Sequence, residues 1–187
     1  MAKQEVCSAH LTYDDYVLFP DDGKRHEIIE GDHFMTPAPR THHQRISGRL
    51  SAALNGVAVS RRLGEVFAAP CDVVLSDENV VQPDLLFVSS ARAEIITEDN
   101  IQGAPDLMVE ILSDSSRKKD EVTKRKLYER FGVAEYWIVD PELESIRVYK
   151  LAQQRYSRAT ELSKEANDVL TTELLPGFHL SISELFE

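Results

Sequence analysis

The chain has 187 residues, of which 42% are hydrophobic and 28% charged, and its formal net charge is −11. A length and composition of this kind suit one folded domain with its own hydrophobic core, and they exclude a wholly disordered chain. The acidic balance argues against a protein that coats nucleic acid non-specifically.

Two cysteines, Cys7 and Cys71, are too few for a disulfide scaffold, and they form no CxxC pair that would indicate a structural zinc site. The segment from Met1 to His10 lacks the apolar stretch of a signal peptide. The apolar runs are also much shorter than the roughly 20 residues that span a bilayer. We therefore predict a cytoplasmic protein with reduced thiols and no membrane segment.

Apolar spacing and capping residues predict the elements of the first half of the chain. Thr12 and Asp15 begin a short helix that ends near Leu18, and Gly31 separates the two strands of a hairpin. A long helix follows with its apolar residues on one face, and His43 lies on that face. The predicted strands cover residues 25–30, 32–35, 65–69, 72–75 and 84–89, and the long helix covers residues 42–57.

The second half of the chain contains two apolar strands, 107–112 and 134–139, separated by a helix over 117–131. Because a crossover helix joins parallel strands, we expect this pair to be parallel and buried on both faces. A strand over 145–151 with a partner in 156–162 and a short helix or turn over 181–186 complete the prediction. The expected fold class is α/β, with a mixed central β-sheet flanked by helices.

Two carboxylates stand in apolar strands. Glu110 lies inside Leu107-Met108-Val109-Glu110-Ile111-Leu112, and Asp84 follows Pro83 at the start of a strand. A carboxylate in such a place is costly unless it is paired or bound to a cation. Two of them on adjacent strands can share a hard cation such as Mg²⁺. The alternatives are a buried ion pair with Arg or Lys for Glu110 and a turn or cap for Asp84.

Lys124 projects into the apolar stripe of the helix over 117–131, near the strand that carries Glu110. Its amine could support a nucleophilic water or stabilise charge on a pentacovalent phosphate. Two alternatives are open: the side chain extends past the core into water, or Asp120 holds it in an i,i+4 pair. The other basic residues near it are expected to point elsewhere; they are Lys118, Lys119, Arg125 and Lys126.

Basic residues gather in two segments of this acidic chain. From His33 to Gly64 there is no acidic residue, and from Arg117 to Arg130 there are seven Lys and Arg against three acids. These segments predict either a local surface for an anionic partner or two solvated helix faces.

Several motifs together resemble a known family. They are Gln82-Pro83-Asp84, Val109-Glu110-Ile111-Leu112-Ser113, the Asp120/Lys124/Tyr128 spacing, Glu135 to Pro141, His26 to Gly31, and Pro39 to His43. Over about residues 11–151 the chain resembles the bacterial putative restriction endonuclease family of the PD-(D/E)xK (restriction-endonuclease-like) nuclease superfamily. We expect residues 1–187 to form a single nuclease-like domain, with a C-terminal strand and helix extension over 152–187.

The resemblance implies hydrolysis of DNA phosphodiester bonds with Mg²⁺, or Mn²⁺ in its place. It implies that Asp84 and Glu110 are metal ligands and that Glu27 is an accessory acid near the metal. The superfamily's lysine normally stands two residues after the acid, where this chain has Leu112. Members similar to this chain supply the lysine from the following helix, which fits Lys124.

Three further residues are candidates for an accessory role in the site. Gln82 and Tyr128 belong to the motifs that carry the resemblance. For His43 two interpretations are open, a residue of the active site or a core histidine whose ring nitrogens are satisfied. The Ser113-Asp114-Ser115-Ser116 segment is predicted to cap the helix that follows it.

Two other functions stay open, because a fold does not determine function. One is a catalytically inactive nucleic-acid-binding or regulatory module, which predicts DNA binding without metal. The other is a homodimeric interaction protein built through an edge strand such as 145–151, which predicts affinity for neither DNA nor metal. We expect a homodimer and a DNA partner. No recognition domain is evident, so sequence-specific restriction is not implied.

Overall fold

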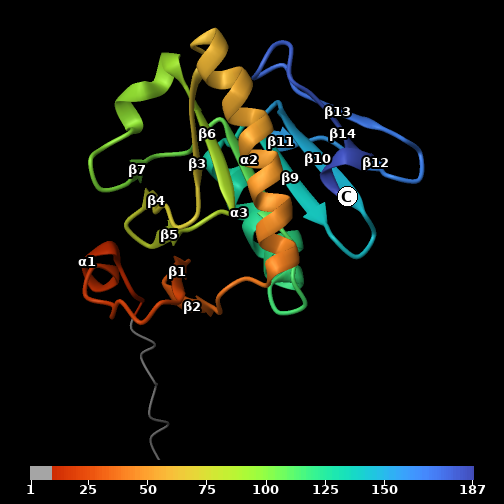
Figure 1. Ribbon diagram of the computed structural model, residues 1–187. Helices are drawn as coiled ribbons and strands as arrows, with labels where there is room; N and C mark the ends of the chain where they lie inside the picture. The colour runs from red at the N-terminus through yellow and green to blue at the C-terminus, as the bar shows by residue number, and fades with distance from the viewer. Residues whose placement is uncertain (1–9) are drawn as a thin grey trace, which may run out of the picture.

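The computed structural model describes residues 10–187, and helices flank its sheets (Figure 1). Its helical segments are α1 (Tyr13–Tyr16), α2 (Thr41–Arg61), the 3₁₀ segment η1 (Ser90–Ile95), the π-helix η2 (Lys119–Lys124), α3 (Arg125–Phe131) and α4 (Ile182–Leu185). The mixed α/β fold class predicted from the sequence is confirmed. Cys71 is a free thiol, and Cys7 lies outside the described residues.

The strands form a five-stranded sheet, a seven-stranded sheet and a two-stranded hairpin. The five-stranded sheet has the order β2-β1-β5-β4-β7, with β1 Arg25–Ile29, β2 Asp32–Thr36, β4 Val73–Ser76, β5 Asn79–Val81 and β7 Ile101–Gln102. The seven-stranded sheet has the order β11-β10-β9-β8-β6-β3, and β12 also pairs with β10. Its strands are β3 Gly64–Ala68, β6 Leu85–Ser89, β8 Leu107–Ile111, β9 Glu135–Asp140, β10 Ser145–Ala152, β11 Arg155–Tyr156 and β12 Thr160–Ser163. The hairpin consists of β13 Val169–Thr171 and β14 His179–Ser181.

Strand directions in the seven-stranded sheet agree with the crossover prediction. β8 and β9 are parallel, and the chain between them forms η2 and α3. β6 runs antiparallel to β8, with Leu85 opposite Val109. Since side chains alternate along a strand, the central strands bury residues on both faces.

The two faces of this sheet have different partners. One face packs against α2, which lies across the strands in Figure 1, through a cluster that includes Leu50, Leu54, Phe87 and Trp137. The other face packs against α3 and the five-stranded sheet through residues such as Met108, Tyr128 and Ile138. Glu110 points to this second face together with Met108 and Leu112, because residues two apart along a strand lie on the same side of the sheet.

The structure corrects several predicted boundaries. β5, β7, η1, β13 and β14 were not predicted, because segments of two to six residues carry too little periodicity. α2 extends to Arg61, four residues beyond the predicted end, and Ala58 continues its buried face. The segment before Arg125 is a π-helix rather than the first turns of an α-helix. Among the described helices, none is both long and apolar enough to cross a membrane.

Candidate active site

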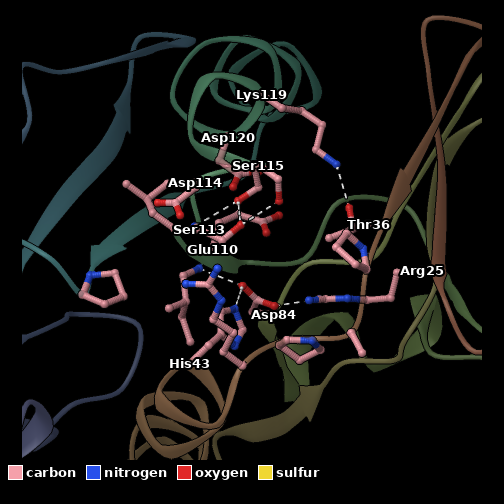
Figure 2. Close-up of a pocket in the computed structure, with 18 of the residues that line it drawn as sticks. Arg25, Thr36, His43, Asp84, Glu110, Ser113, Asp114, Ser115, Lys119 and Asp120 are labelled. Carbon is pink, nitrogen blue, oxygen red and sulfur yellow. Dashed lines mark hydrogen bonds and ion pairs between the residues drawn. The ribbon is translucent and has the colours of Figure 1, made fainter.

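A cavity of about 450 Å³ lies beside the start of β6 and the end of β8 (Figure 2). Its walls come from β1, from the proline-containing loop before α2, from the first turn of α2, and from η2 with the serine-rich loop before it. The lining residues that matter below are Arg25, Glu27, Arg40, His42, His43, Gln82, Asp84, Glu110, Lys119, Asp120 and Lys124. The structure thus brings six of the seven sequence-predicted site residues to one cavity. The seventh, Tyr128, does not line the cavity but donates a hydrogen bond to Glu110.

Glu110 lies in β8, and Asp84 immediately precedes the neighbouring antiparallel strand β6. Leu85 is opposite Val109, so the residues next to them, Asp84 and Glu110, also face each other across the ladder. Both are buried, at 4% and 3% exposure. This is the arrangement of two carboxylates on adjacent strands that the sequence predicted.

Asp84 is held by three donors from three different elements. Arg25 Nη1 lies 2.6 Å from Oδ1, and the Ile111 amide donates to Oδ2 over 2.8 Å. His43 Nε2 lies 3.1 Å from Oδ2, so Arg25 and His43 reach the same carboxylate from β1 and α2 (Figure 2). Burial by itself would raise the pKa of Asp84, but His43, Arg25 and the Ile111 amide outweigh it and lower the pKa to about 2.

His43 is therefore a residue of the cavity wall, and its interpretation as a satisfied core histidine is wrong. One ring nitrogen faces Asp84, whereas the buried Nδ1 has no hydrogen-bond partner among the described residues. The sequence could not separate the two interpretations, because position 43 lies both on the apolar face of the helix and in its first turn.

Glu110 is bound differently from Asp84. Its Oε1 accepts hydrogen bonds from Lys124 Nζ and from the Tyr128 hydroxyl, each over 2.8 Å. Burial raises the pKa of Glu110 to about 8, and Asp120, Asp84 and Glu27 add to the rise against the opposing effect of Lys124. Opposite pKa shifts in two facing carboxyls are a pattern found at functional sites.

Lys124 joins Glu110 to Glu27. Its Nζ lies 2.6 Å from Glu27 Oε1, and its side chain is 3% exposed. The alternative in which the side chain extends into water is therefore wrong. Glu27 also accepts a hydrogen bond from the Gln82 backbone N–H at Oε1, over 3.0 Å, and one from Lys119 Nζ at Oε2, over 2.6 Å. Burial would raise the pKa of Glu27, but Lys124 and Lys119 lower it to about 2.

Lys119 is a site residue that the sequence prediction placed elsewhere. At about 100° per residue, an α-helix would set residues 119 and 124 about 140° apart. A π-helix closes its hydrogen bonds over five residues, which brings these two side chains to the same side. Lys119 consequently reaches Glu27 and Thr36, and the direction of its side chain toward Thr36 is visible in Figure 2. Nothing in the residue pattern indicated the wider turn.

The donor set fits a hard divalent cation held by two carboxylates. A carboxylate offers about four lone-pair positions, and Asp84 uses three of them for Arg25, His43 and the Ile111 amide. Within the described part of the chain Glu110 accepts hydrogen bonds at Oε1 alone, so its Oε2 is available to a ligand. Among residues 10–187, no group of three or more His, Cys, Asp or Glu side chains is arranged to hold a metal ion. The remaining ligands of a cation here would be waters or substrate oxygens, as is usual for Mg²⁺.

Comparisons with known proteins identify the family and the fold. The Uma2 family model, described as "Putative restriction endonuclease", matches residues 13–183 and so extends beyond residue 151, where the resemblance read from the sequence ended. The fold is similar to the crystal structure of a "putative nuclease belonging to DUF820" from Anabaena variabilis, with a TM-score of 0.80 and 22% identity. That match covers 94% of this chain and 97% of the other. A search of curated proteins gives no match. Because the family model covers most of the sequence, the chain belongs to the Uma2 family of restriction-endonuclease-like proteins.

Proposed function

We propose that the protein is a nuclease that hydrolyses DNA phosphodiester bonds with the help of Mg²⁺ or Mn²⁺. The observation that carries this proposal is the pair Asp84 and Glu110, which face each other beside the cavity with Lys124 bound to Glu110. Membership in a restriction-endonuclease-like family supports the same class of reaction.

Asp84 and Glu110 would hold the cation, which when bound lowers the pKa of a coordinated water and offsets charge on the phosphate. Lys124 would stabilise the negative charge that develops during attack, because its ammonium lies next to Glu110. Glu27 keeps this lysine and Lys119 in place, and Tyr128 orients Glu110. Both glutamates therefore contribute to the position of the amine.

Basic residues on the cavity walls could contact a phosphate, although acids outnumber Lys and Arg in the lining. Arg40 and His42 come from the first basic segment, and Lys119 comes from the second. The two basic segments, far apart in the sequence, thus contribute to one cavity. A bound divalent cation would offset the acids of the lining, and Arg40 and Lys119 would then attract a phosphodiester.

The test compares wild-type protein with Asp84→Asn and Glu110→Gln, because both changes keep side-chain volume and remove a carboxyl group that could bind the cation. Mg²⁺ binding is measured by calorimetry, and cleavage is measured on labelled oligonucleotides. We expect both variants to lose metal affinity and to cleave at least about 100-fold more slowly. Glu161→Gln is the control, since it removes one charge from the exposed strand β12.

The outcome separates this proposal from its alternatives. DNA binding that needs no metal and persists in Asp84→Asn would favour a binding or regulatory module. Affinity of the folded wild-type protein for neither metal nor DNA would favour an interaction protein. A single domain over residues 1–187, a cytoplasmic location and a homodimer stay predictions, and light scattering after size exclusion tests the dimer.

A further inference from the structure

Asp120 has a buried carboxylate oxygen without a partner. The residue is 2% exposed and lines the cavity, yet its Oδ1 has no hydrogen-bond partner among the described residues. Buried polar atoms almost always have a partner, from the protein or from ordered water. An unpaired oxygen at the edge of a cavity therefore indicates a ligand that completes it.

Lys124 offers the complementary group. An ammonium has three N–H donors, and two acceptors lie within hydrogen-bond range, Glu27 Oε1 at 2.6 Å and Glu110 Oε1 at 2.8 Å. Asp120 Oδ1 lies 3.8 Å from the same nitrogen, which is too far for a direct hydrogen bond. The i,i+4 ion pair considered from the sequence is therefore present, but it has no direct hydrogen bond.

A bridging water would join Asp120 Oδ1 to the third N–H donor of Lys124. An oxygen about 2.8 Å from both atoms forms a compact triangle with their separation of 3.8 Å. Such a water accepts a hydrogen bond from Lys124 and donates one to Asp120. A nucleophilic water needs this combination, with an acceptor for its proton and a positive charge beside its oxygen.

The backbone of Asp120 is fixed on both sides. Its amide donates to the Ser116 carbonyl over 3.0 Å, and its carbonyl accepts the Tyr136 hydroxyl over 3.0 Å. Both Asp120 and Lys124 belong to the π-helix η2, a type of turn that is frequent at functional sites. The unpaired oxygen is thus held in position by a rigid segment.

We propose that Asp120 and Lys124 hold the hydrolytic water and that Asp120 accepts its proton, an inference that rests on the proposed nuclease function. As the water oxygen bonds to phosphorus, one O–H bond breaks and the proton moves to Asp120 Oδ1. The bond from phosphorus to the leaving sugar oxygen breaks, and its electron pair stays on that oxygen. The leaving oxygen takes a proton from solvent water, and Asp120 returns its proton to solvent, so the net reaction consumes one water.

The acidity of Asp120 suits this role. Burial raises the pKa of Asp120 to about 6, against the lowering effects of Lys124 and Ser116. A general base is most effective when its pKa lies near the working pH.

The first experiment compares wild-type protein, Asp120→Asn and Glu121→Gln on DNA that the wild-type protein cleaves. Glu121 is the matched control, because it is adjacent on η2 but bonds Arg147 away from the cavity. We expect Asp120→Asn to lower kcat by about 100-fold to 10,000-fold, with KM and Mg²⁺ affinity unchanged and the acidic limb of the pH profile lost. A kcat of Asp120→Asn within about 3-fold of wild type would overturn the inference.

Rescue by an added carboxylate separates a catalytic role from a structural one. Asp120→Ala leaves space for formate, and formate is expected to restore part of kcat in that variant but not in Glu110→Gln. Inactivity that formate does not change, in a folded Asp120→Ala protein, would contradict the proton-acceptor role.

A high-resolution crystal structure tests the water site without any cleavage assay. We expect an ordered water within about 3.2 Å of both Lys124 Nζ and Asp120 Oδ1. A direct bond between the two groups, with no water, would overturn the inference even if the enzyme is active. Wild-type protein that binds Mg²⁺ and DNA but cleaves neither strand would instead overturn the proposed function, and the proton-transfer step with it.

Discussion

The two faces of the seven-stranded sheet are both buried, but they are buried in different ways. The face under α2 is almost wholly apolar, and the acid on its border, Glu135, is bound by Trp137 Nε1. The face under η2 and α3 has Glu110 in its middle, and Glu27, Asp120 and Lys124 cover it. One face is therefore stabilised mainly by packing, whereas the other contains charges that packing cannot satisfy.

A buried cluster of charged side chains distinguishes the second face from the first. Buried ion pairs often contribute less stability than an apolar core of the same shape, since desolvation offsets their attraction. Three carboxylates around one ammonium are more than stability requires. The excess of acids points to a chemical role on this face and a structural role on the other.

The largest effect is expected on the charged face, from Lys124→Met. The change leaves Glu27 and Glu110 buried without their shared cation, and removal of one partner of a buried pair costs about 3–5 kcal/mol of unfolding free energy. Urea unfolding followed by the fluorescence of the single tryptophan, Trp137, measures it. A loss below about 1 kcal/mol would mean that the buried carboxylates do not depend on Lys124 for their stability.

On the apolar face, Leu54→Ala is expected to lower the unfolding free energy by about 2–5 kcal/mol, because Leu54 is fully buried and leaves a cavity. The loss should be the same from pH 5 to pH 8, and Mg²⁺ binding should be unchanged. Calorimetry and urea unfolding give both quantities. Altered metal affinity in this variant would show that the two faces are coupled.

A third prediction concerns pH, which should act through the charged face. Glu27 and Asp84 have pKa values of about 2 in the folded protein, below their ordinary values. The unfolded chain therefore binds protons more readily, so their stabilisation is complete above about pH 5 and is lost as pH falls toward 2. Each of the two carboxylates contributes on the order of 2 kcal/mol to the unfolding free energy.

The effect of Glu110 on stability changes with pH in the opposite direction. Its pKa of about 8 means that the folded protein keeps a proton that the unfolded chain releases, so stability falls as pH rises from about 5 to 8. Urea unfolding between pH 3 and 9 should give a maximum near pH 5. Glu110→Gln should remove the alkaline decline and leave the acidic decline; an unchanged profile would contradict this assignment.

The smallest effect is expected at an exposed ion pair outside both faces. Arg130 and Glu30 are 2.8 Å apart, with side chains 52% and 64% exposed. Arg130→Ala should change the unfolding free energy by less than about 1 kcal/mol. A loss comparable to that of Lys124→Met would mean that burial is not the cause of the difference.

Much of the fold follows from residue patterns. Apolar runs such as Leu107 to Leu112 have few alternatives to a buried strand, and the helix between β8 and β9 made their parallel pairing predictable. Thr12 is the N-cap of α1, as its spacing to Asp15 indicated, and the two residues also form a capping box. Short elements such as β5 and β7 were missed, because their pairing depends on distant partners and not on local periodicity.

The site was predictable in its chemistry and less so in its contacts. Glu110 was conspicuous because an acid in an apolar strand is costly, and Lys124 because a lysine interrupted an apolar stripe. The contacts of Arg25 with Asp84 and of Lys119 with Glu27 join residues 59 and 92 positions apart. Contacts between residues so far apart in the sequence depend on tertiary structure, and the direction of the Lys119 side chain also depends on the π-helical turn.

The ion pair between Glu27 and Lys124 has a consequence for discovering the ligand. Glu27 belongs to the five-stranded sheet, whereas Lys124 precedes the helix that packs on the seven-stranded sheet. The cavity thus exists only when both sheets are assembled, and an unfolded chain has no equivalent affinity. A ligand of this cavity must then raise the unfolding free energy by mass action, by about 2.7 kcal/mol at 100 times its dissociation constant. The melting temperature rises with it. Thermal shifts with a panel of cations and oligonucleotides would therefore rank ligands before any reaction is known.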